Sequence, residues 1–166
     1  MNSVFKPTQE EISLLLKLYS TCSFMGLVTE CRLMIKKYPN YPKLYNILGV
    51  AYHGLEKFDI AIECYQEALK IDPSYAEAHN NMGNTLKVKG DFDTAVESFK
   101  KAIFYKPNFA EAFNNMGASL QSKGDYSLAI SKFQKAIEIK NDFYDAYVNK
   151  GNALRLFGDL SNSIQS

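Results

Sequence analysis

Residues 76–109 read AEAHNNMGNTLKVKGDFDTAVESFKKAIFYKPNF, and the next 34 residues begin AEAFNNMGASLQSKGDYSLAISKF. Both segments open with the same small and amide-bearing residues, and both place Lys-Gly-Asp near their middle. Agreement at a fixed spacing is typical of repeat architectures, in which one small structural unit is stacked on copies of itself. The repeat is therefore the strongest indication of the fold.

The same period of 34 residues runs through most of the chain as five ladders. Two ladders consist of alanine, one of glycine, one of aromatic residues and one of proline. Their members are Gly49, Gly83, Gly117 and Gly151; Ala61, Ala95 and Ala129; Tyr65, Phe99 and Phe133; Ala68, Ala102 and Ala136; and Pro39, Pro73 and Pro107, with Asn141 in the next slot. Five ladders with one period exclude a chance match.

Each repeat contains two segments whose apolar residues recur at helical spacing. In residues 76–109 the two segments are separated by Gly90 and Asp91. Glycine allows the left-handed conformation that ends a helix, and aspartate can cap the helix that follows. The pairs Gly124-Asp125 and Gly158-Asp159 repeat this arrangement. We therefore expect a turn between two helices at each of these places.

The period and its residues resemble the tetratricopeptide repeat. Residues 42–75, 76–109 and 110–143 match the family pattern, with His79 in a slot that is usually aromatic. The resemblance implies an all-α fold, a right-handed α-solenoid of stacked antiparallel helix hairpins. Glycine and alanine in this pattern lie where the two helices of a hairpin approach most closely.

The two ends of the array depart from the pattern. Residues 8–41 keep the phase but carry Leu15 and Leu27 in place of small residues, so we interpret them as a degenerate capping repeat. Residues 144–166 begin a further repeat that stops early, with Ser163 in an alanine slot. From this abrupt end we expect the chain to be a fragment of a longer protein.

Composition argues against several classes of function. The net charge of +1 gives no overall electrostatic attraction to nucleic acid or to an anionic membrane. Only two arginines are present, so few guanidinium groups are available to bind phosphate. The longest uncharged runs, 18–29 and 44–55, are too short to span a bilayer. Three scattered cysteines and two histidines have no metal-ligand spacing and indicate reduced thiols in the cytoplasm. We expect no cofactor, no metal and no catalytic site.

The resemblance also implies a groove lined by the first helix of each repeat. Asparagines recur there, and a carboxamide can both donate to and accept from the backbone of an extended peptide. In this respect the chain resembles the arrays that precede O-linked N-acetylglucosamine transferase domains. The candidate peptide-binding residues are Asn46, Asn80, Asn81, Asn84, Lys87, Asn114, Asn115, Gln121, Asn149, Asn152 and Arg155.

The asparagines also have a structural interpretation, as hydrogen-bonding residues between repeats. Replacing Asn81, Asn115 and Asn149 by alanine distinguishes the two. We expect the triple replacement to leave helicity and melting nearly unchanged while abolishing peptide capture. Equal capture, or a chain that melts early, would show that the asparagines are structural. A carboxylate clamp is excluded, because the lysine that it requires is replaced by Asn46, Asn80 or Asn114.

These features predict a scaffold that binds an extended peptide or a partner protein in its groove. One alternative is the substrate-recruiting arm of a larger enzyme, such as a glycosyltransferase, whose catalytic domain lies beyond residue 166. A second alternative is self-assembly, in which exposed terminal helices join copies of the chain into a homo-oligomer.

Overall fold

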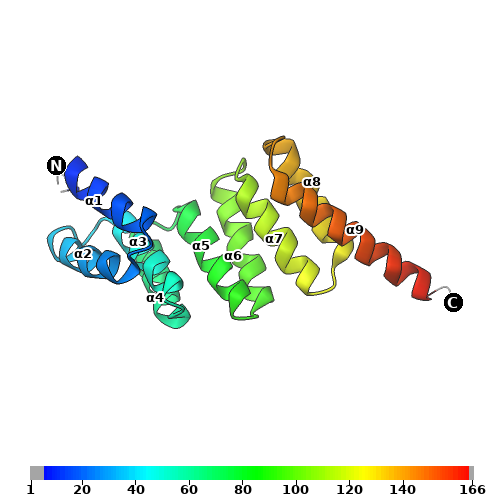
Figure 1. Ribbon diagram of the computed structural model, residues 1–166, viewed down its shortest axis with the longest axis horizontal. Coiled ribbons are helices and arrows are strands. Elements are labelled where there is room, and N and C mark those ends of the chain that lie inside the picture. The colour runs from blue at the N-terminus through cyan, green and yellow to red at the C-terminus, as the bar shows by residue number, and fades with distance from the viewer. Residues whose placement is uncertain (1–5, 165–166) are drawn as a thin grey trace. The chain divides into compact units, whose positions relative to one another are not determined.

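The computed structural model describes residues 6–164, and side chains as far as Asp159. Within these residues the chain forms nine helices and no strand (Figure 1). The helices are α1 (Gln9–Ser20), α2 (Phe24–Lys37), α3 (Pro42–Gly54), α4 (Phe58–Ile71), α5 (Ala76–Val88), α6 (Phe92–Tyr105), α7 (Ala110–Ser122), α8 (Tyr126–Ile139) and α9 (Tyr144–Ile164). None of the described helices is long and apolar enough to cross a membrane.

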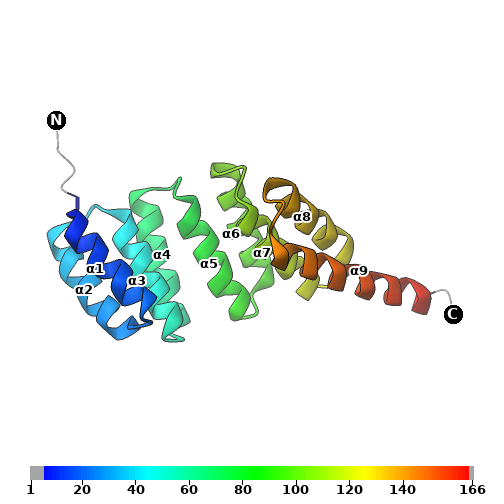
Figure 2. The same cartoon turned by 45° about the horizontal axis from the view of Figure 1, so that its top comes forward.

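The chain divides into two compact units, and the boundary falls inside α5, between Thr85 and Leu86. In the N-terminal unit each helix packs on the next, α1 on α2, α2 on α3 and α3 on α4. In the C-terminal unit α6 packs on α7, α7 on α8 and α8 on α9. Short connections reverse the chain between consecutive helices (Figure 2). The expected fold class, an all-α solenoid of stacked hairpins, is confirmed.

Most hairpin turns use a residue with a left-handed backbone, at the same place in the repeat. Gly90 and Gly124 have φ of 83° and 88°, as the sequence predicts. Cys22 and Glu56 occupy the equivalent places with φ of 53° and 58°. A residue with a Cβ is disfavoured in this conformation. The packing of the flanking helices therefore holds Cys22 and Glu56 in a strained turn.

The expected aspartate cap forms in only one of the three turns. The Asp91 carboxylate accepts a hydrogen bond from the Thr94 N–H at 3.2 Å. Asp125 makes no such bond, and its carboxylate lies 4.0 Å from Lys123 Nζ instead. The prediction of a capping Asp125 was therefore wrong, because a neighbouring lysine competes for its carboxylate.

The expected turn at Gly158-Asp159 is also wrong. Helix α9 runs without a break from Tyr144 to Ile164. In the other repeats a second helix packs back on the first and stabilises the turn between them. Among the described residues no second helix packs back on α9, so nothing there favours a turn over continued helix.

Glycine permits close contact between the two helices of a hairpin. A Cβ on Gly49 would lie 2.5 Å from the Tyr65 ring, and one on Gly117 would lie 2.6 Å from the Phe133 ring. The first hairpin achieves the same close helix contact with a different pair of residues. Leu15 stands in the glycine slot and Cys31 in the aromatic slot, and both are buried in one core cluster. A larger residue on one helix is thus matched by a smaller one on its partner.

The aromatic slot near the start of the first helix has a second role in three of the repeats, those of α3, α5 and α9. Its side chain donates a hydrogen bond to the carbonyl six residues earlier. The pairs are Tyr45 Oη to Pro39 O at 3.0 Å, His79 Nε2 to Pro73 O at 3.0 Å, and Tyr147 Oη to Asn141 O at 3.2 Å. His79 therefore replaces tyrosine here because it can donate the same bond.

Candidate peptide-binding site

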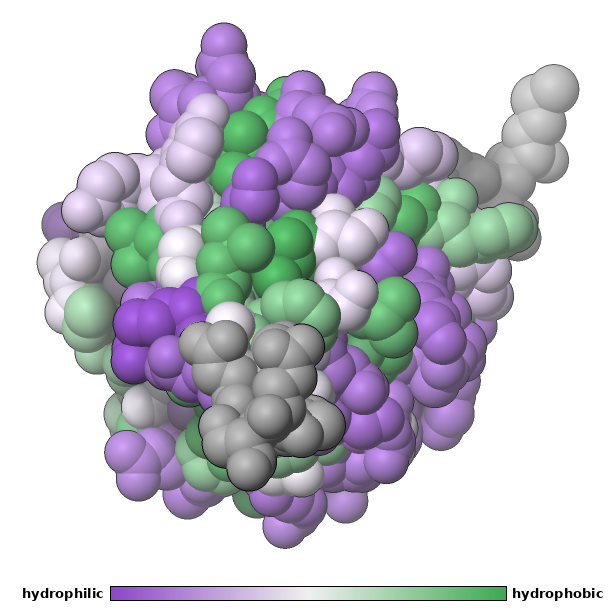
Figure 3. Space-filling view, turned by 90° about the vertical axis from the view of Figure 1, so that its right-hand side faces the viewer, coloured by the Kyte–Doolittle hydropathy of each residue, from purple (hydrophilic) through white to green (hydrophobic). Residues whose placement is uncertain are grey.

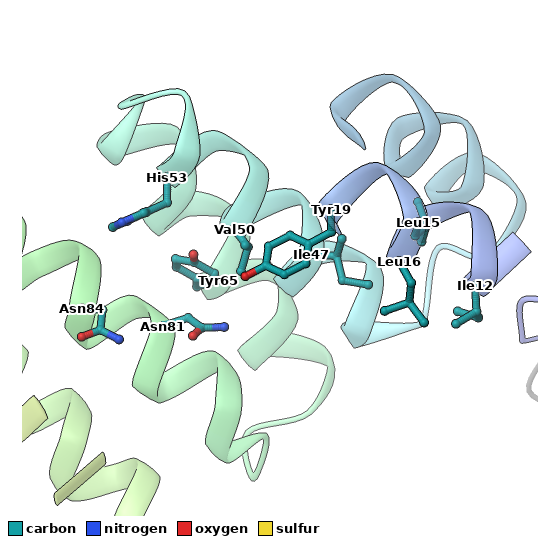
Figure 4. A pocket seen from close by; sticks show the side chains of 10 residues that line it. All are labelled: Ile12, Leu15, Leu16, Tyr19, Ile47, Val50, His53, Tyr65, Asn81 and Asn84. Carbon is teal, nitrogen blue, oxygen red and sulfur yellow. The ribbon is translucent and has the colours of Figure 1, made fainter. Parts of the chain in front are cut away.

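The N-terminal unit carries a hollow with a volume of about 380 Å³ (Figure 4). Its side chains come from α1, α3, α4 and α5. The lining residues are Ile12, Leu15, Leu16, Tyr19, Ile47, Val50, His53, Tyr65, Asn81 and Asn84. We call this feature the apolar hollow.

Helical spacing brings these side chains to one surface. On α1, Ile12, Leu16 and Tyr19 stand four and three residues apart, which places them on the same face of the helix. On α3, Ile47 and Val50 are related in the same way. The side chain of Tyr65, which is 1% exposed, comes from α4 behind them. Three first helices thus supply the walls, and one second helix supplies the floor.

The hollow exposes more apolar surface than the core beneath it. Leu16 is 60% exposed and Tyr19 is 52% exposed, whereas Leu15 beside them is 1% exposed. None of the ten lining residues is an aspartate, glutamate, lysine or arginine. Small-molecule and peptide sites are commonly concave and apolar, with a few polar groups that fix orientation.

The polar groups gather on the side of the hollow formed by His53, Asn81 and Asn84 (Figure 4). The Thr85 hydroxyl donates to the Asn81 carbonyl at 3.0 Å, and His53 Nδ1 lies 2.8 Å from that hydroxyl oxygen. The Thr85 hydroxyl thus links the His53 ring to the backbone of α5. Burial raises the pKa of the Tyr65 phenol, and a hydrogen bond with Thr85 acts in the opposite direction. This network fixes the rings that border the hollow.

Four of the predicted asparagines form two pairs that hold neighbouring repeats together. Asn81 Nδ2 donates to Asn46 Oδ1 at 3.0 Å, and Asn149 Nδ2 donates to Asn114 Oδ1 at 3.0 Å. Asn46 and Asn114 are 7% and 8% exposed. The structural interpretation of these asparagines is therefore supported. With these bonds present, we now expect replacement of the asparagines to lower the melting temperature, contrary to the expectation from the sequence.

The predicted site residues fall into three groups. Asn81 and Asn84 line the apolar hollow. Asn46, Asn80 and Asn114 are buried, and so less available to a ligand than expected. The remaining residues lie outside the hollow: Asn115, Gln121, Asn149 and Lys87 are half-buried, and Asn152 and Arg155 are exposed. Peptide binding by this last group stays a prediction.

Two of these residues are basic, and their surroundings differ. Lys87 is partly desolvated, and this burial lowers the pKa of its ammonium group. Arg155 forms an ion pair with Asp159 at 3.8 Å, in which both side chains are more than two-thirds exposed. Exposed pairs of this kind contribute little to stability.

Sequence reasoning missed the contribution of α1 to the site. Ile12, Leu16 and Tyr19 belong to the repeat that was interpreted only as a cap. Leu16 and Tyr19 occupy the repeat places of Val50 and His53, which the family geometry assigns to the groove. Applying the same places to residues 8–41 would have found Leu16 and Tyr19.

The C-terminal unit carries a second apolar surface on α9. Tyr144, Tyr147, Val148 and Leu154 are between 42% and 76% exposed. Unlike Gly49 and Gly117, Gly151 has no atom within 4 Å of the position that a Cβ would take. Figure 3 views the side on which α9 lies, and apolar surface is visible there among hydrophilic side chains.

Two of the three cysteines, Cys31 and Cys64, are buried. Burial raises the pKa of the Cys31 thiol to about 12 and that of Cys64 to about 11. Because the thiolate is the reactive form, both side chains are unreactive packing residues. Among the described residues no group of three or more His, Cys, Asp or Glu is placed to hold a metal ion.

Comparison with known families identifies the repeat. A model described as TPR repeat matches residues 53–88 and 83–124, and one described as Tetratricopeptide repeat matches residues 110–143. The matched residues run together from 53 to 143, which is more than half of the chain. No curated protein matches the chain.

Three solved structures share the fold. A crystal structure of MamA has a TM-score of 0.76 at 25% identity, covering 90% of this chain and 87% of MamA. The first TPR of Spaghetti (RPAP3), bound to the HSP90 peptide SRMEEVD, has a TM-score of 0.69 at 17% identity, covering 70% of this chain and 93% of that one. The Sgt2 TPR domain from Aspergillus fumigatus has a TM-score of 0.71 at 20% identity, covering 73% and 82%.

Proposed function

We propose that this chain, which is built from tetratricopeptide repeats, binds a peptide segment of another protein in the apolar hollow. Repeats of this family generally mediate protein–protein interaction, and they are non-catalytic modules. The chain is accordingly not an enzyme by itself.

One observation carries the proposal: Leu16 and Tyr19 remain 60% and 52% exposed although both border a hollow whose other lining residues are buried or half-buried. Exposing two large apolar side chains is unfavourable, at roughly 25 cal/mol for each Å² that a partner would cover. Contiguous apolar surface of this kind marks interaction sites. A peptide that covers Leu16 and Tyr19 removes this unfavourable exposure.

The polar side of the hollow supports a peptide in particular. Asn81 and Asn84 lie three residues apart on α5 and present carboxamides, which can pair with backbone N–H and C=O groups. A structural neighbour with 17% identity was solved with a peptide bound. That likeness concerns the fold, whereas the choice of ligand depends on the side chains of this chain.

The experiment is a selection of random twelve-residue peptides displayed on phage, with the intact chain as bait. We expect enrichment of peptides that bind reversibly, and we expect synthetic copies to compete with one another. Competition is expected because a single hollow accepts one peptide at a time. Failure to enrich any peptide over a bait-free surface, after repeated rounds, would overturn the proposal.

A second candidate function is self-assembly through α9. It is supported by the exposed residues Tyr147 and Leu154 and by the open space beside Gly151. Replacing Tyr147 and Leu154 together by glutamate should convert any oligomer of the wild-type chain to monomer. Light scattering across a tenfold range of concentration measures this. A wild-type chain that is monomeric throughout would remove this candidate.

Two further points stay predictions. The three cysteines, of which Cys31 and Cys64 are buried, favour a reducing compartment such as the cytoplasm. The role of a recruiting arm for a glycosyltransferase draws part of its support from the asparagine ladder. The hydrogen bonds from Asn81 to Asn46 and from Asn149 to Asn114 weaken that argument.

A further inference from the structure

We propose that the apolar hollow is specific for a peptide segment with two neighbouring large apolar side chains and no acidic residue between them. This inference rests on the proposed function and names the chemistry of its ligand. It assigns the anchoring role to α1, the first helix of the degenerate repeat, through Leu16 and Tyr19.

The charge of the lining determines what the hollow rejects. None of its ten residues is charged, and its walls are leucine, isoleucine, valine and tyrosine. Moving an ionised carboxylate from water into such surroundings is strongly unfavourable unless a partner compensates it. The polar groups on its border, His53, Asn81 and Asn84, offer no permanent positive charge. An acidic side chain or a free C-terminal carboxylate is therefore a poor ligand at this position.

The volume determines how much the hollow accepts. A cavity of about 150 Å³ in another protein's core accommodates benzene. At about 380 Å³ the hollow has room for roughly twice that volume of apolar groups. One leucine or phenylalanine would leave it partly unfilled, and unfilled apolar space loses contacts. Two such side chains on nearby residues of one peptide match the volume.

The position of the polar groups determines how the peptide backbone is held. Asn81 uses an amide N–H on Asn46 Oδ1, and its carboxamide oxygen is of a kind that can accept a hydrogen bond from a peptide N–H. Asn84 lies almost one helical turn further along α5 and borders the same hollow. In Figure 4 these amides lie to one side of the hollow, and Ile12 and Leu16 lie to the other. The peptide is expected to place its apolar side chains towards α1 and its backbone towards α5.

The test uses the phage-displayed twelve-residue library with three baits: the wild-type chain, Leu16→Lys and Leu33→Lys. Leu16 is 60% exposed in the hollow, and Leu33 is 55% exposed on α2, so the two substitutions are matched in chemistry and exposure. Peptides enriched on the wild type should carry two large apolar residues within five positions of each other. Their affinity should fall roughly tenfold or more for Leu16→Lys, which removes one buried apolar contact. It should not change for Leu33→Lys.

Two controls keep the result interpretable. Helicity and melting of each variant are measured first, and Tyr19→Ser serves as a second hollow variant if Leu16→Lys is poorly folded. The peptide SRMEEVD, which a structural neighbour binds, is added as an acidic competitor. It should not displace the enriched peptides.

The outcomes separate this inference from the proposed function. Enriched peptides that are acidic, but that lose affinity for Leu16→Lys and Tyr19→Ser, would overturn the inference and leave peptide binding in the hollow intact. Enriched peptides that bind both hollow variants as well as the wild type would overturn the inference and the proposed function together. An empty selection would overturn both. Loss of binding for the hollow variants together with retention for Leu33→Lys supports both.

Discussion

The carboxamide of Asn81 donates a hydrogen bond of 3.0 Å to the carboxamide of Asn46, in the preceding repeat. Asn46 is 7% exposed, so its oxygen depends on this bond. Asn81→Ala leaves a buried acceptor unsatisfied and should lower the free energy of unfolding by about 1–3 kcal/mol. Chemical denaturation measures the loss. Asn84→Ala, on the same helix, is the control and should change stability by no more than about 0.5 kcal/mol. Equal stability of the two variants would contradict the structural role of Asn81.

A second prediction concerns the glycines of the first helices. A Cβ on Gly117 would lie 2.6 Å from the Phe133 ring, whereas one on Gly151 would meet no atom within 4 Å. Gly117→Ala should therefore destabilise the chain by about 1–3 kcal/mol through overpacking. Gly151→Ala should stabilise it by up to about 1 kcal/mol, because alanine favours helix. Thermal melting of both variants tests this pair of predictions. A change in melting temperature of the same sign in both variants would refute the explanation.

The strained turn at Glu56 gives a third prediction. Glu56 has φ of 58°, a conformation that disfavours any residue with a Cβ by roughly 1 kcal/mol or more. Glu56→Gly should raise the melting temperature, although the greater freedom of glycine in the unfolded chain offsets part of the gain. Gly90→Ala, at φ of 83° with open space around it, should have the opposite effect. A Glu56→Gly chain that melts earlier than the wild type would show that the Glu56 side chain contributes contacts of its own.

The pH dependence of stability should report on Glu11. Its carboxylate accepts hydrogen bonds from the Thr8 N–H, Lys37 and Tyr38, and these lower its pKa from 4.5 to about 2, the Thr8 bond most. Because the folded pKa is depressed, the stabilisation is present above pH 4.5 and is lost as the pH falls towards 2. Glu11→Gln should melt earlier than the wild type at neutral pH, and the gap should close on acidification. Glu10→Gln is the control for the loss of one first-turn charge, and a gap that persists at low pH would contradict this assignment.

The sequence was sufficient for the fold because its strongest signals come from backbone geometry and close packing. Gly90 and Gly124 marked turns that only glycine adopts easily, and Gly49 and Gly117 marked contacts that only a small residue allows. Such requirements recur in several repeats at the same spacing, which makes them visible in the sequence. The prediction of a turn at Gly158 was wrong because a Gly-Asp pair forms a turn only where a second helix packs back on the first.

The candidate site was less predictable because it depends on which side chains remain uncovered. The asparagines matched a known groove pattern, yet burial and pairing remove Asn46 and Asn114 from the surface. The apolar residues Leu16 and Tyr19 belong to residues 8–41, which we interpreted from the sequence only as a capping repeat. Only the tertiary arrangement shows that they remain 60% and 52% exposed beside a hollow. Helical periodicity cannot distinguish a buried stripe from an exposed one.

The central claim is that the apolar hollow is where a peptide binds. The most direct measurement is methyl nuclear magnetic resonance of the chain, labelled at leucine, isoleucine and valine and titrated with a peptide enriched in the selection. The account predicts saturable shifts of Leu16, Ile47 and Val50, with Leu33 on α2 and Leu128 on α8 unchanged. Shifts confined to α9, or to Leu33 and Leu128, with the hollow methyls unmoved would contradict it.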